Sequence, residues 1–174
     1  MALAHLKSKL ARIGLATAAA AAVAATLSNA PLAQTGYRGP THEVSVKIAR
    51  VRALDQMDVF SKGDFFARVT IAGKSQDTPR ARQQNYISPN WTITAAVPAG
   101  RQPISIELFD KDLTRDEPID INALPNKRKQ DFSVDTRSCR ITGFSGSNRC
   151  DVTIVRAGKE KKSAEISFSV SVRK

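Results

Sequence analysis

The sequence has few of the residues from which most metal centres and catalytic sites are built. It contains two cysteines and two histidines, and His42 is the only histidine beyond residue 33. A zinc site made of histidine and cysteine is therefore excluded. The sequence also has no nucleophile–base pair and no phosphate-binding glycine loop. These absences leave no candidate catalytic site except carboxylates around a metal, which can hydrolyse phosphoesters.

Acidic residues are scarce relative to basic ones. The chain has 27 Lys and Arg against 16 Asp and Glu, a net charge of +11. Such a charge favours anionic partners, namely nucleic acid, acidic lipid or lipopolysaccharide. Charge alone does not choose among these partners.

The sequence has no apolar run long enough for a spanning helix. The run over residues 13–27 is 15 residues long, whereas a membrane-spanning helix needs about 20. Lys7, Lys9 and Arg12 precede this run and small residues follow it. This order is typical of a secretory signal peptide. The alternatives are an alanine-rich helix of the fold and an uncleaved anchor.

We therefore predict a signal peptide over residues 1–33, a linker over residues 34–42 and one domain over residues 43–174. Loss of residues 1–33 leaves a net charge of +8, because they contain three basic and no acidic residues. The prediction places the protein in a secreted or periplasmic location and argues against a nucleic-acid partner.

The two cysteines agree with export. Cys139 and Cys150 fall opposite each other in a hairpin centred between Phe144 and Ser145. This register permits a disulfide, which would stabilise the fold by about 3 kcal/mol and is expected only in an oxidising compartment. The alternative is a hairpin with two reduced thiols.

Beyond the predicted signal peptide, apolar residues alternate with a period of two and show no helical period. Seven or eight short strands separated by turns favour an all-β fold, an antiparallel β-sandwich. The clearest alternating segments are residues 44–52, 65–71, 91–97, 104–110 and 166–172.

Two loops that follow strands carry several carboxylates. Asp110 and Asp112 leave the end of one strand on the same side, so their charges repel unless a cation lies between them. Alternate loops of a sandwich collect at one end, which lets the two loops meet. Oxygen ligands of this kind and number suit Ca²⁺. The predicted ligands are Asp58, Asp64, Asp110, Asp112, Asp116 and Glu117.

These segments resemble the C2 domain family, a calcium-dependent phospholipid-binding module. Asp58 and Asp64 have the spacing of the family's first aspartates, and a strand follows them as it does there. Residues 88–91 are similar to the family's Asn-Pro-x-Trp, and residues 106–112 resemble its apolar strand followed by Asp-x-Asp. The resemblance implies an eight-stranded antiparallel β-sandwich.

The resemblance also implies the ligand set, with one position open. The family's pattern selects Asp58, Asp64, Asp110, Asp112 and either Asp116 or Glu117. The second acidic loop is one residue shorter than in the family, which leaves both of the last two acids as candidates. Asp120 stands where the family usually has glycine.

Apolar residues lie beside the acidic ones in both loops, and exposed apolar tips usually contact a partner. In C2 domains such residues insert into the membrane while Ca²⁺ bridges lipid phosphates. The predicted membrane-contacting residues are Val59, Phe60, Leu113 and Ile119. Basic residues near an anionic surface would add about 1 kcal/mol each. They are Lys74, Arg80, Arg82, Lys127, Arg128 and Lys129.

The sequence thus predicts an exported, non-catalytic module that binds Ca²⁺ and an anionic phospholipid or lipopolysaccharide surface. The alternative is a β-sandwich that acts without calcium, either in protein interaction or as a structural component of an envelope. Its partner would then be another envelope protein.

Overall fold

A computed structural model describes residues 41–55, 63–82, 84–112, 115–145 and 148–174. The predicted signal peptide and most of the predicted linker lie outside these residues. The described residues form twelve β-strands. None of them belongs to a helix that could cross a membrane.

The first sheet has five strands in the order β11-β12-β1-β4, with β5 also paired to β1. Every pairing in it is antiparallel. Its strands are β1 (Thr41–Ala53), β4 (Tyr86–Ile87), β5 (Trp91–Pro98), β11 (Ile154–Ala157) and β12 (Ala164–Arg173).

The second sheet has seven strands in the order β10-β9-β8-β6-β2-β3, with β7 also paired to β6. It too is antiparallel throughout. Its strands are β2 (Phe65–Ile71), β3 (Lys74–Asp77), β6 (Arg101–Asp110), β7 (Glu117–Ile119), β8 (Gln130–Asp135), β9 (Arg140–Thr142) and β10 (Asn148–Arg149).

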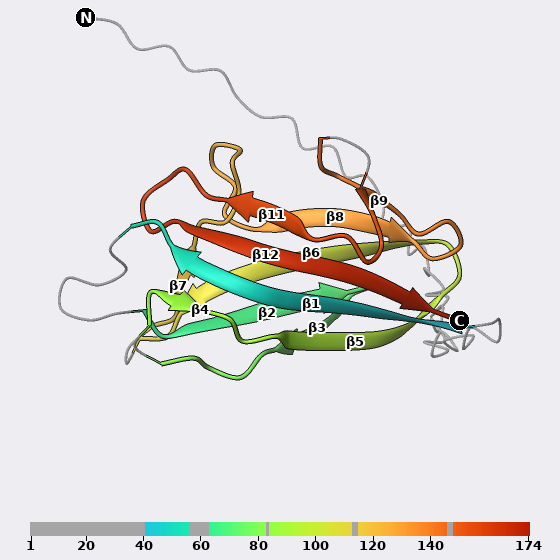
Figure 1. The fold of residues 1–174 in the computed structure, drawn as a ribbon, viewed down its shortest axis with the longest axis horizontal. Coiled ribbons are helices and arrows are strands. Elements are labelled where there is room, and N and C mark those ends of the chain that lie inside the picture. The colour runs from blue at the N-terminus through green and yellow to red at the C-terminus, as the bar shows by residue number, and fades with distance from the viewer. Residues whose placement is uncertain (1–40, 56–62, 83, 113–114, 146–147) are drawn as a thin grey trace, which may run out of the picture. The chain divides into compact units, whose positions relative to one another are not determined.

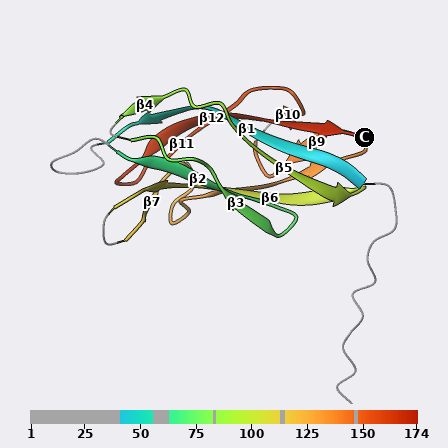
Figure 2. The same cartoon turned by 90° about the horizontal axis from the view of Figure 1, so that it is seen from below.

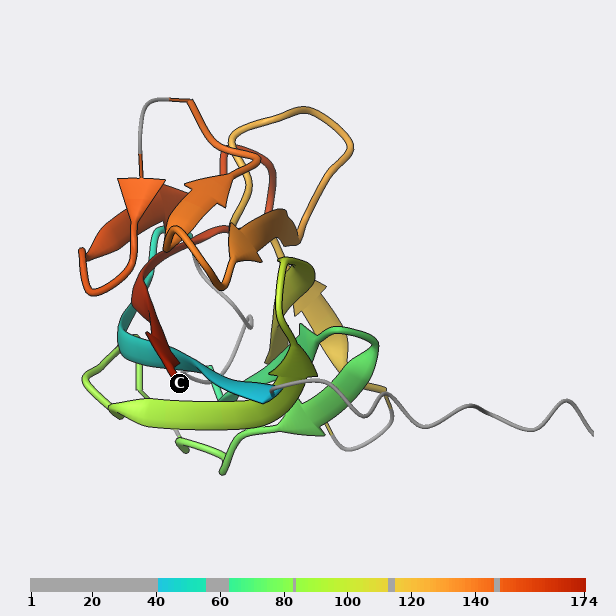
Figure 3. The same cartoon turned by 90° about the vertical axis from the view of Figure 1, so that its right-hand side faces the viewer.

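The two sheets pack face to face around one hydrophobic core. Figure 1 shows β12 and β1 in front of β6, and Figure 2 shows the same two layers from below. Viewed from the end where the chain finishes, β1 and β12 lie on one side of the core and β6 on the other (Figure 3). The predicted all-β sandwich is confirmed, and eight of the strands in the described residues have four or more residues.

Alternation of apolar and polar residues explains which face of each strand is buried. Trp91, Ile93, Ala95 and Val97 of β5 face the core, and the residues between them are exposed. Burial by this alternation stabilises by about 25 cal/mol for each Å² of apolar surface removed from water. In β1 the alternation shifts after Ile48, where an irregularity in its pairing with β12 brings Val51 rather than Arg50 into the core.

Two element boundaries differ from the sequence expectation. Lys74 to Asp77 form β3, which lies outside the segments that alternation identifies as strands. All four are exposed, so no apolar alternation marks the strand, and the turn at Ala72 and Gly73 with positive φ makes the hairpin. Thr41 and His42, which were placed in the linker, belong to β1.

The predicted disulfide is confirmed. Cys139 and Cys150 are bonded, with 5.3 Å between their Cα atoms. The pairing of Ile141 with Asn148 and of Arg140 with Arg149 centres the hairpin where the sequence placed it. Cross-links of this kind stabilise chiefly by restricting the unfolded chain.

The strand directions give the sandwich two distinct ends. At the loop end, β1 finishes at Ala53, β6 finishes at Asp110 and β12 begins at Ala164, and these lie at the left of Figure 1. The opposite end holds the start of β1 and the finish of β12, since Glu43 pairs with Arg173.

A buried carboxylate organises part of the loop end. Asp120 is fully buried, and its Oδ2 accepts hydrogen bonds of 2.8 Å from the N–H groups of Lys159 and Glu160. Its Oδ1 accepts a third, also 2.8 Å, from Asn122 N–H. Gly158 lies so close that an added Cβ would stand 2.1 Å from the Asp120 carbonyl oxygen. Asp120 therefore ties the β11–β12 turn to the segment after β7.

We predict that Asp120→Asn lowers the free energy of unfolding by about 1.5–3 kcal/mol, the value of a hydrogen bond to a charged group. The amide NH₂ cannot accept, so at least one of the three backbone N–H groups loses its partner in either amide orientation. Urea unfolding of the variant measures this loss.

Asp131→Asn is the matched control, because Asp131 is exposed on β8. It should change the unfolding free energy by less than about 0.5 kcal/mol. Equal effects of the two substitutions would contradict the role assigned to Asp120.

Candidate functional site

The described residues that border the two predicted acidic loops lie side by side at the loop end. Phe65 pairs with Asp110 across β2 and β6, which places Asp64 beside the end of β6. The N–H of Asp64 donates to Asp110 Oδ1 at 2.7 Å, and the N–H of Lys111 donates to the Asp64 carbonyl oxygen at 3.0 Å. The structure thus joins two of the predicted calcium ligands directly.

Glu117 is the second acid that the structure places next to Asp110. The two residues are directly paired across β6 and β7. Side chains of directly paired residues lie on the same face of an antiparallel sheet. Asp110 is almost fully buried, and Glu117 is half-buried. Of the two acids that the sequence left as alternatives, Glu117 is thus the one opposite Asp110.

Basic side chains accompany these carboxylates. Arg80 forms an ion pair with Asp64, and Lys162 forms one with Glu117. Lys111 Nζ lies 2.7 Å from Asp116 Oδ1. Three of the predicted acidic ligands, Asp64, Asp116 and Glu117, are therefore balanced by basic side chains of the protein.

The donor set has the chemistry that Ca²⁺ prefers, since carboxylate oxygens are hard ligands. Asp64, Asp110 and Glu117 come from three strand ends, and Asp112 follows half-buried after β6. Among the residues that the structure describes, no three acidic, histidine or cysteine side chains gather closely enough to hold a metal ion. Asp58, the remaining predicted ligand, lies outside the described residues.

The family model for the C2 domain matches residues 42–135. The chain belongs to the C2 domain family. A search of curated proteins found no match.

Solved structures agree with the fold of this C2 domain. The C2A domain of plant extended synaptotagmin 1 is 14% identical with a TM-score of 0.54, over 78% of this chain and 97% of that one. Calcium-bound extended-synaptotagmin 2, containing its C2A and C2B domains, is 13% identical with a TM-score of 0.53, over 77% and 46%. At such identities the likeness shows the fold alone.

Human GIVD cytosolic phospholipase A2, in complex with methyl gamma-linolenyl fluorophosphonate, is 12% identical with a TM-score of 0.53. The match covers 77% of this chain and 17% of the phospholipase. The C2 domain described here therefore spans less than a fifth of that enzyme's length.

One of the predicted membrane-contacting residues of the C2 domain is in the core. Ile119 is 1% exposed and pairs with Leu108 in β6, so it is not available at a loop tip. Its side chain follows the alternation of β7, in which Pro118 is exposed. Val59, Phe60 and Leu113 lie outside the described residues.

The loop end exposes two other large side chains that sequence reasoning did not select. Leu54 is 41% exposed, and Tyr86 is 52% exposed. Leu54 N–H bonds to the Ser163 carbonyl oxygen, and Tyr86 pairs with Arg52 near the end of β1. The one sequence signal for an exposed Leu54 is its position directly after an alternating strand. No sequence pattern indicates that Tyr86 is exposed at this end.

The predicted anionic-surface residues do not form a single surface. Lys74 pairs with Ile71 at the opposite end of the sandwich, away from the loop end. Arg80 is engaged with Asp64. Arg128 is half-buried and donates to the carbonyl oxygens of Pro118 and Lys161. Arg82, Lys127 and Lys129 are also exposed, and Lys129 Nζ lies 3.3 Å from Asp131 Oδ1.

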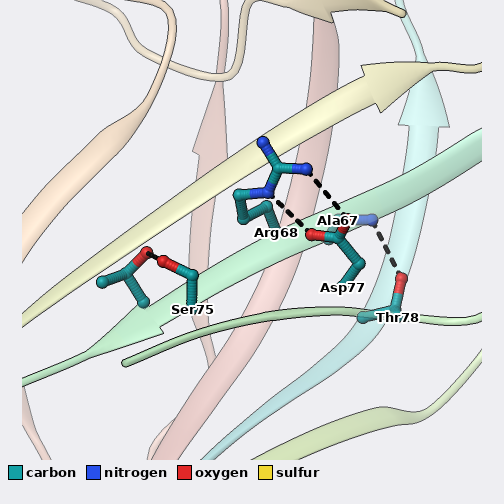
Figure 4. A network of polar contacts seen from close by, with 6 residues as sticks. Ala67, Arg68, Ser75, Asp77 and Thr78 are labelled. Carbon is teal, nitrogen blue, oxygen red and sulfur yellow. Dashed lines mark hydrogen bonds and ion pairs between the residues drawn. The ribbon is translucent and has the colours of Figure 1, made fainter. Parts of the chain in front are cut away.

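Arg68 on β2 is held by its neighbour on β3. Its Nε and a terminal nitrogen donate to the two carboxylate oxygens of Asp77 at 2.7 and 2.9 Å (Figure 4). The hydrogen bond from Arg68 holds the pKa of Asp77 below its usual value, although burial opposes this. Beside this pair, the hydroxyls of Thr70 and Ser75 are 2.8 Å apart. This face therefore offers paired charges rather than a free cation.

The lowered pKa of Asp77 gives this ion pair a defined pH dependence. Its contribution to stability is full above the unfolded pKa and is lost as the pH falls through the lower folded pKa. We predict that Asp77→Asn lowers the unfolding free energy at pH 7 by about 0.2–1 kcal/mol, the range for exposed pairs. The difference from the unmodified chain should begin to shrink near the ordinary aspartate pKa of about 4 and should vanish only below the lowered pKa of the folded state.

Urea unfolding between pH 7 and pH 3 measures this difference. Comparison with Arg68→Gln and with the double variant isolates the coupling between the two side chains. A coupling energy that is as large at pH 3 as at pH 7 would exclude the ionised carboxylate as its source.

Proposed function

We propose that this C2 domain is an exported, non-catalytic module that attaches to an anionic phospholipid or lipopolysaccharide surface, with Ca²⁺ held at the loop end. The observation that carries the proposal is the approach of Asp64 to Asp110, with Glu117 paired beside it. These residues come from three strand ends that lie side by side at the loop end, although the described carboxylates do not yet gather as a metal site.

The proposed ligands are Asp58, Asp64, Asp110, Asp112 and Glu117. Glu117 is preferred because it stands opposite Asp110, whereas Asp116 pairs with Lys111. Bound Ca²⁺ would add positive charge that attracts lipid phosphate oxygens.

The ion pairs set a condition on this site. Arg80 and Lys162 occupy carboxylate oxygens of Asp64 and Glu117, so both side chains must turn away when Ca²⁺ binds. Moving these cations opposes binding, and a weak site with a Kd of about 0.1–1 mM is expected, in the range of extracellular modules. Such an affinity suffices where calcium is plentiful.

The disulfide and the net charge support the remaining parts of the proposal. The bond between Cys139 and Cys150 fits an oxidising compartment outside the cytosol. The charge of +11 fits an anionic partner. The proposal includes no catalytic step, because the sequence offers no nucleophile–base pair and His42 is buried in β1.

We predict that 1 mM Ca²⁺ raises the Tm relative to EGTA. A Kd of about 0.1 mM would stabilise the native state by about 1.4 kcal/mol, or roughly 3–8 °C in Tm. Asp110→Asn should abolish this rise, because it removes a central ligand. Thermal unfolding with and without Ca²⁺ measures the change for each variant separately, whatever its starting Tm.

Asp151→Asn is the control, because Asp151 is exposed and asparagine tolerates its positive φ. It should keep the calcium-induced rise. An unchanged Tm in the unmodified chain would reject the calcium site.

A second candidate function is calcium-independent binding to a protein or a structural component of an envelope. The same ion pairs favour it, because Arg80, Lys111 and Lys162 already balance the carboxylates. A Tm that does not respond to calcium, together with retained binding to cell-envelope material in EGTA, would select this function.

Membrane docking is tested at the proposed loop tips. We predict that Phe60→Ser combined with Leu113→Ser reduces calcium-dependent co-sedimentation with anionic vesicles by at least about tenfold. Burial of two large apolar side chains in the membrane would stabilise the bound state by about 3–6 kcal/mol. A tenfold loss of binding corresponds to about 1.4 kcal/mol, so loss of this burial is sufficient to cause it.

Val155→Ser is the matched control, because Val155 is exposed on β11, outside the acidic loops. It should leave binding unchanged. Ile119 is unsuitable for this test, since its substitution would disturb the core. Undiminished binding of the double variant would exclude insertion of these tips.

A further inference from the structure

A pocket with several charged side chains lies at the loop end, beside the proposed calcium site. It has a volume of about 470 Å³ and contains four basic and two acidic side chains. Three separate segments contribute to it: the approach to β7, the loop before β8 and the β11–β12 turn. Its lining residues are Arg115, Asp116, Glu117, Pro118, Arg128, Lys161 and Lys162.

The charges of this pocket are unevenly matched. Asp116 is paired with Lys111, and Glu117 is paired with Lys162. Within the part of the chain that the structure describes, Arg115, Arg128 and Lys161 have no carboxylate partner. The pocket therefore presents three cations to a ligand, and its two acids are already neutralised.

Arg128 is fixed in place before any ligand arrives. One terminal nitrogen donates to the Pro118 carbonyl oxygen at 2.7 Å, and the other donates to the Lys161 carbonyl oxygen at 3.2 Å. A guanidinium has five N–H donors, so three remain for a ligand. A side chain that is already ordered loses less conformational entropy on binding than a mobile one.

The backbone that carries Lys161 is also held. The Asp120 carboxylate binds the N–H groups of Lys159 and Glu160, and Asp120 N–H donates to the Lys162 carbonyl oxygen at 2.8 Å. Glu160 in turn accepts from Asn126 N–H at 2.7 Å. These contacts keep the β11–β12 turn beside the loop that carries Arg128.

We propose that this pocket binds a phosphate monoester group, such as that of an anionic lipid headgroup, without calcium. Three cations in one pocket match a phosphate carrying about two negative charges, and arginine N–H groups suit its oxygens. The proposal rests on the proposed attachment to an anionic surface, but it does not require the calcium ligands. It gives the domain a headgroup site built on Arg115, Arg128 and Lys161, none of which is a calcium ligand, although Glu117 borders both sites.

The test uses the full chain in EGTA, so that calcium plays no part. Isothermal titration with inorganic phosphate and with glycerol 3-phosphate measures binding of the soluble group. Co-sedimentation with phosphatidylcholine vesicles that contain or lack phosphatidic acid measures binding of the same group on a lipid. The test variant combines Arg115→Gln with Lys161→Gln, both exposed side chains.

The matched control combines Arg137→Gln with Arg140→Gln. Both residues are exposed near the cysteine hairpin, away from the loop end, and the control loses the same charge. We expect the test variant to weaken phosphate binding and phosphatidic acid binding about tenfold, or 1.4 kcal/mol, while the control keeps both.

The outcomes separate the sources of phosphate. Binding only to vesicles with phosphatidic acid, lost in the test variant, supports a lipid headgroup site. Binding of the soluble compounds as well supports the same pocket with a free phosphate ligand. Equal losses in the test and control variants would show a response to net charge and overturn the site, as would no binding of any probe.

The calcium-induced rise in Tm, measured on the same variants, distinguishes this proposal from the proposed function. A test variant that keeps this rise but loses phosphate binding supports a separate pocket. An unmodified chain that shows the rise but binds no phosphate probe overturns the pocket and leaves the calcium site standing.

Discussion

The hydrogen bonds of the buried Asp120 carboxylate hold together the segments on which the rest of the loop end depends. Two backbone N–H groups of the distant β11–β12 turn and one from neighbouring Asn122 meet at this one side chain. A buried carboxylate is stable only when its oxygens are satisfied in this way. Gly158 completes the arrangement, because any larger residue there would collide with the Asp120 backbone. The positions of Lys161 and Lys162 follow from these contacts.

The loop end combines two kinds of charge in a small space. Carboxylates at the start of β2, the end of β6 and the start of β7 lie at this end, and Arg80, Lys111 and Lys162 form ion pairs with acids there. Exposed ion pairs of this kind contribute little to stability. Their consequence is functional. They determine the binding free energy of a cation at the carboxylates, and they determine which basic side chains remain unpaired to bind an anion. Calcium and phosphate would therefore engage different members of one charge network.

The sequence predicted those features that depend on local pattern. Alternation identified the long strands, and the cysteine spacing identified the disulfide, because pairing across a hairpin depends only on distance from the turn. The approach of Asp64 to Asp110 was also predicted, since each acid lies at the end of a recognisable strand. β3 escaped detection because its four residues are all exposed and carry no alternation.

Features that depend on distant partners were not predictable in the same way. Lys162 and Glu117 are 45 residues apart, and no local pattern joins them. The sequence predicts Arg128 as an anionic-surface residue, but in the structure backbone carbonyl groups of two other segments hold it. Ile119 follows the acidic loop in sequence, yet its pairing with Leu108 turns it into the core. In each case a tertiary contact that the local sequence pattern does not contain determines what the side chain does.

The placement of the start of β1 and the finish of β12 has a practical consequence for presentation of the domain. The first described strand begins at Thr41 and the last finishes at Arg173, and both positions lie at the end of the sandwich away from the carboxylates (Figure 1). A tether or a fused protein attached at either position would leave from the rear of the domain. An immobilised or linked copy would accordingly keep its acidic loops and its basic pocket facing outward, free to meet a surface head-on.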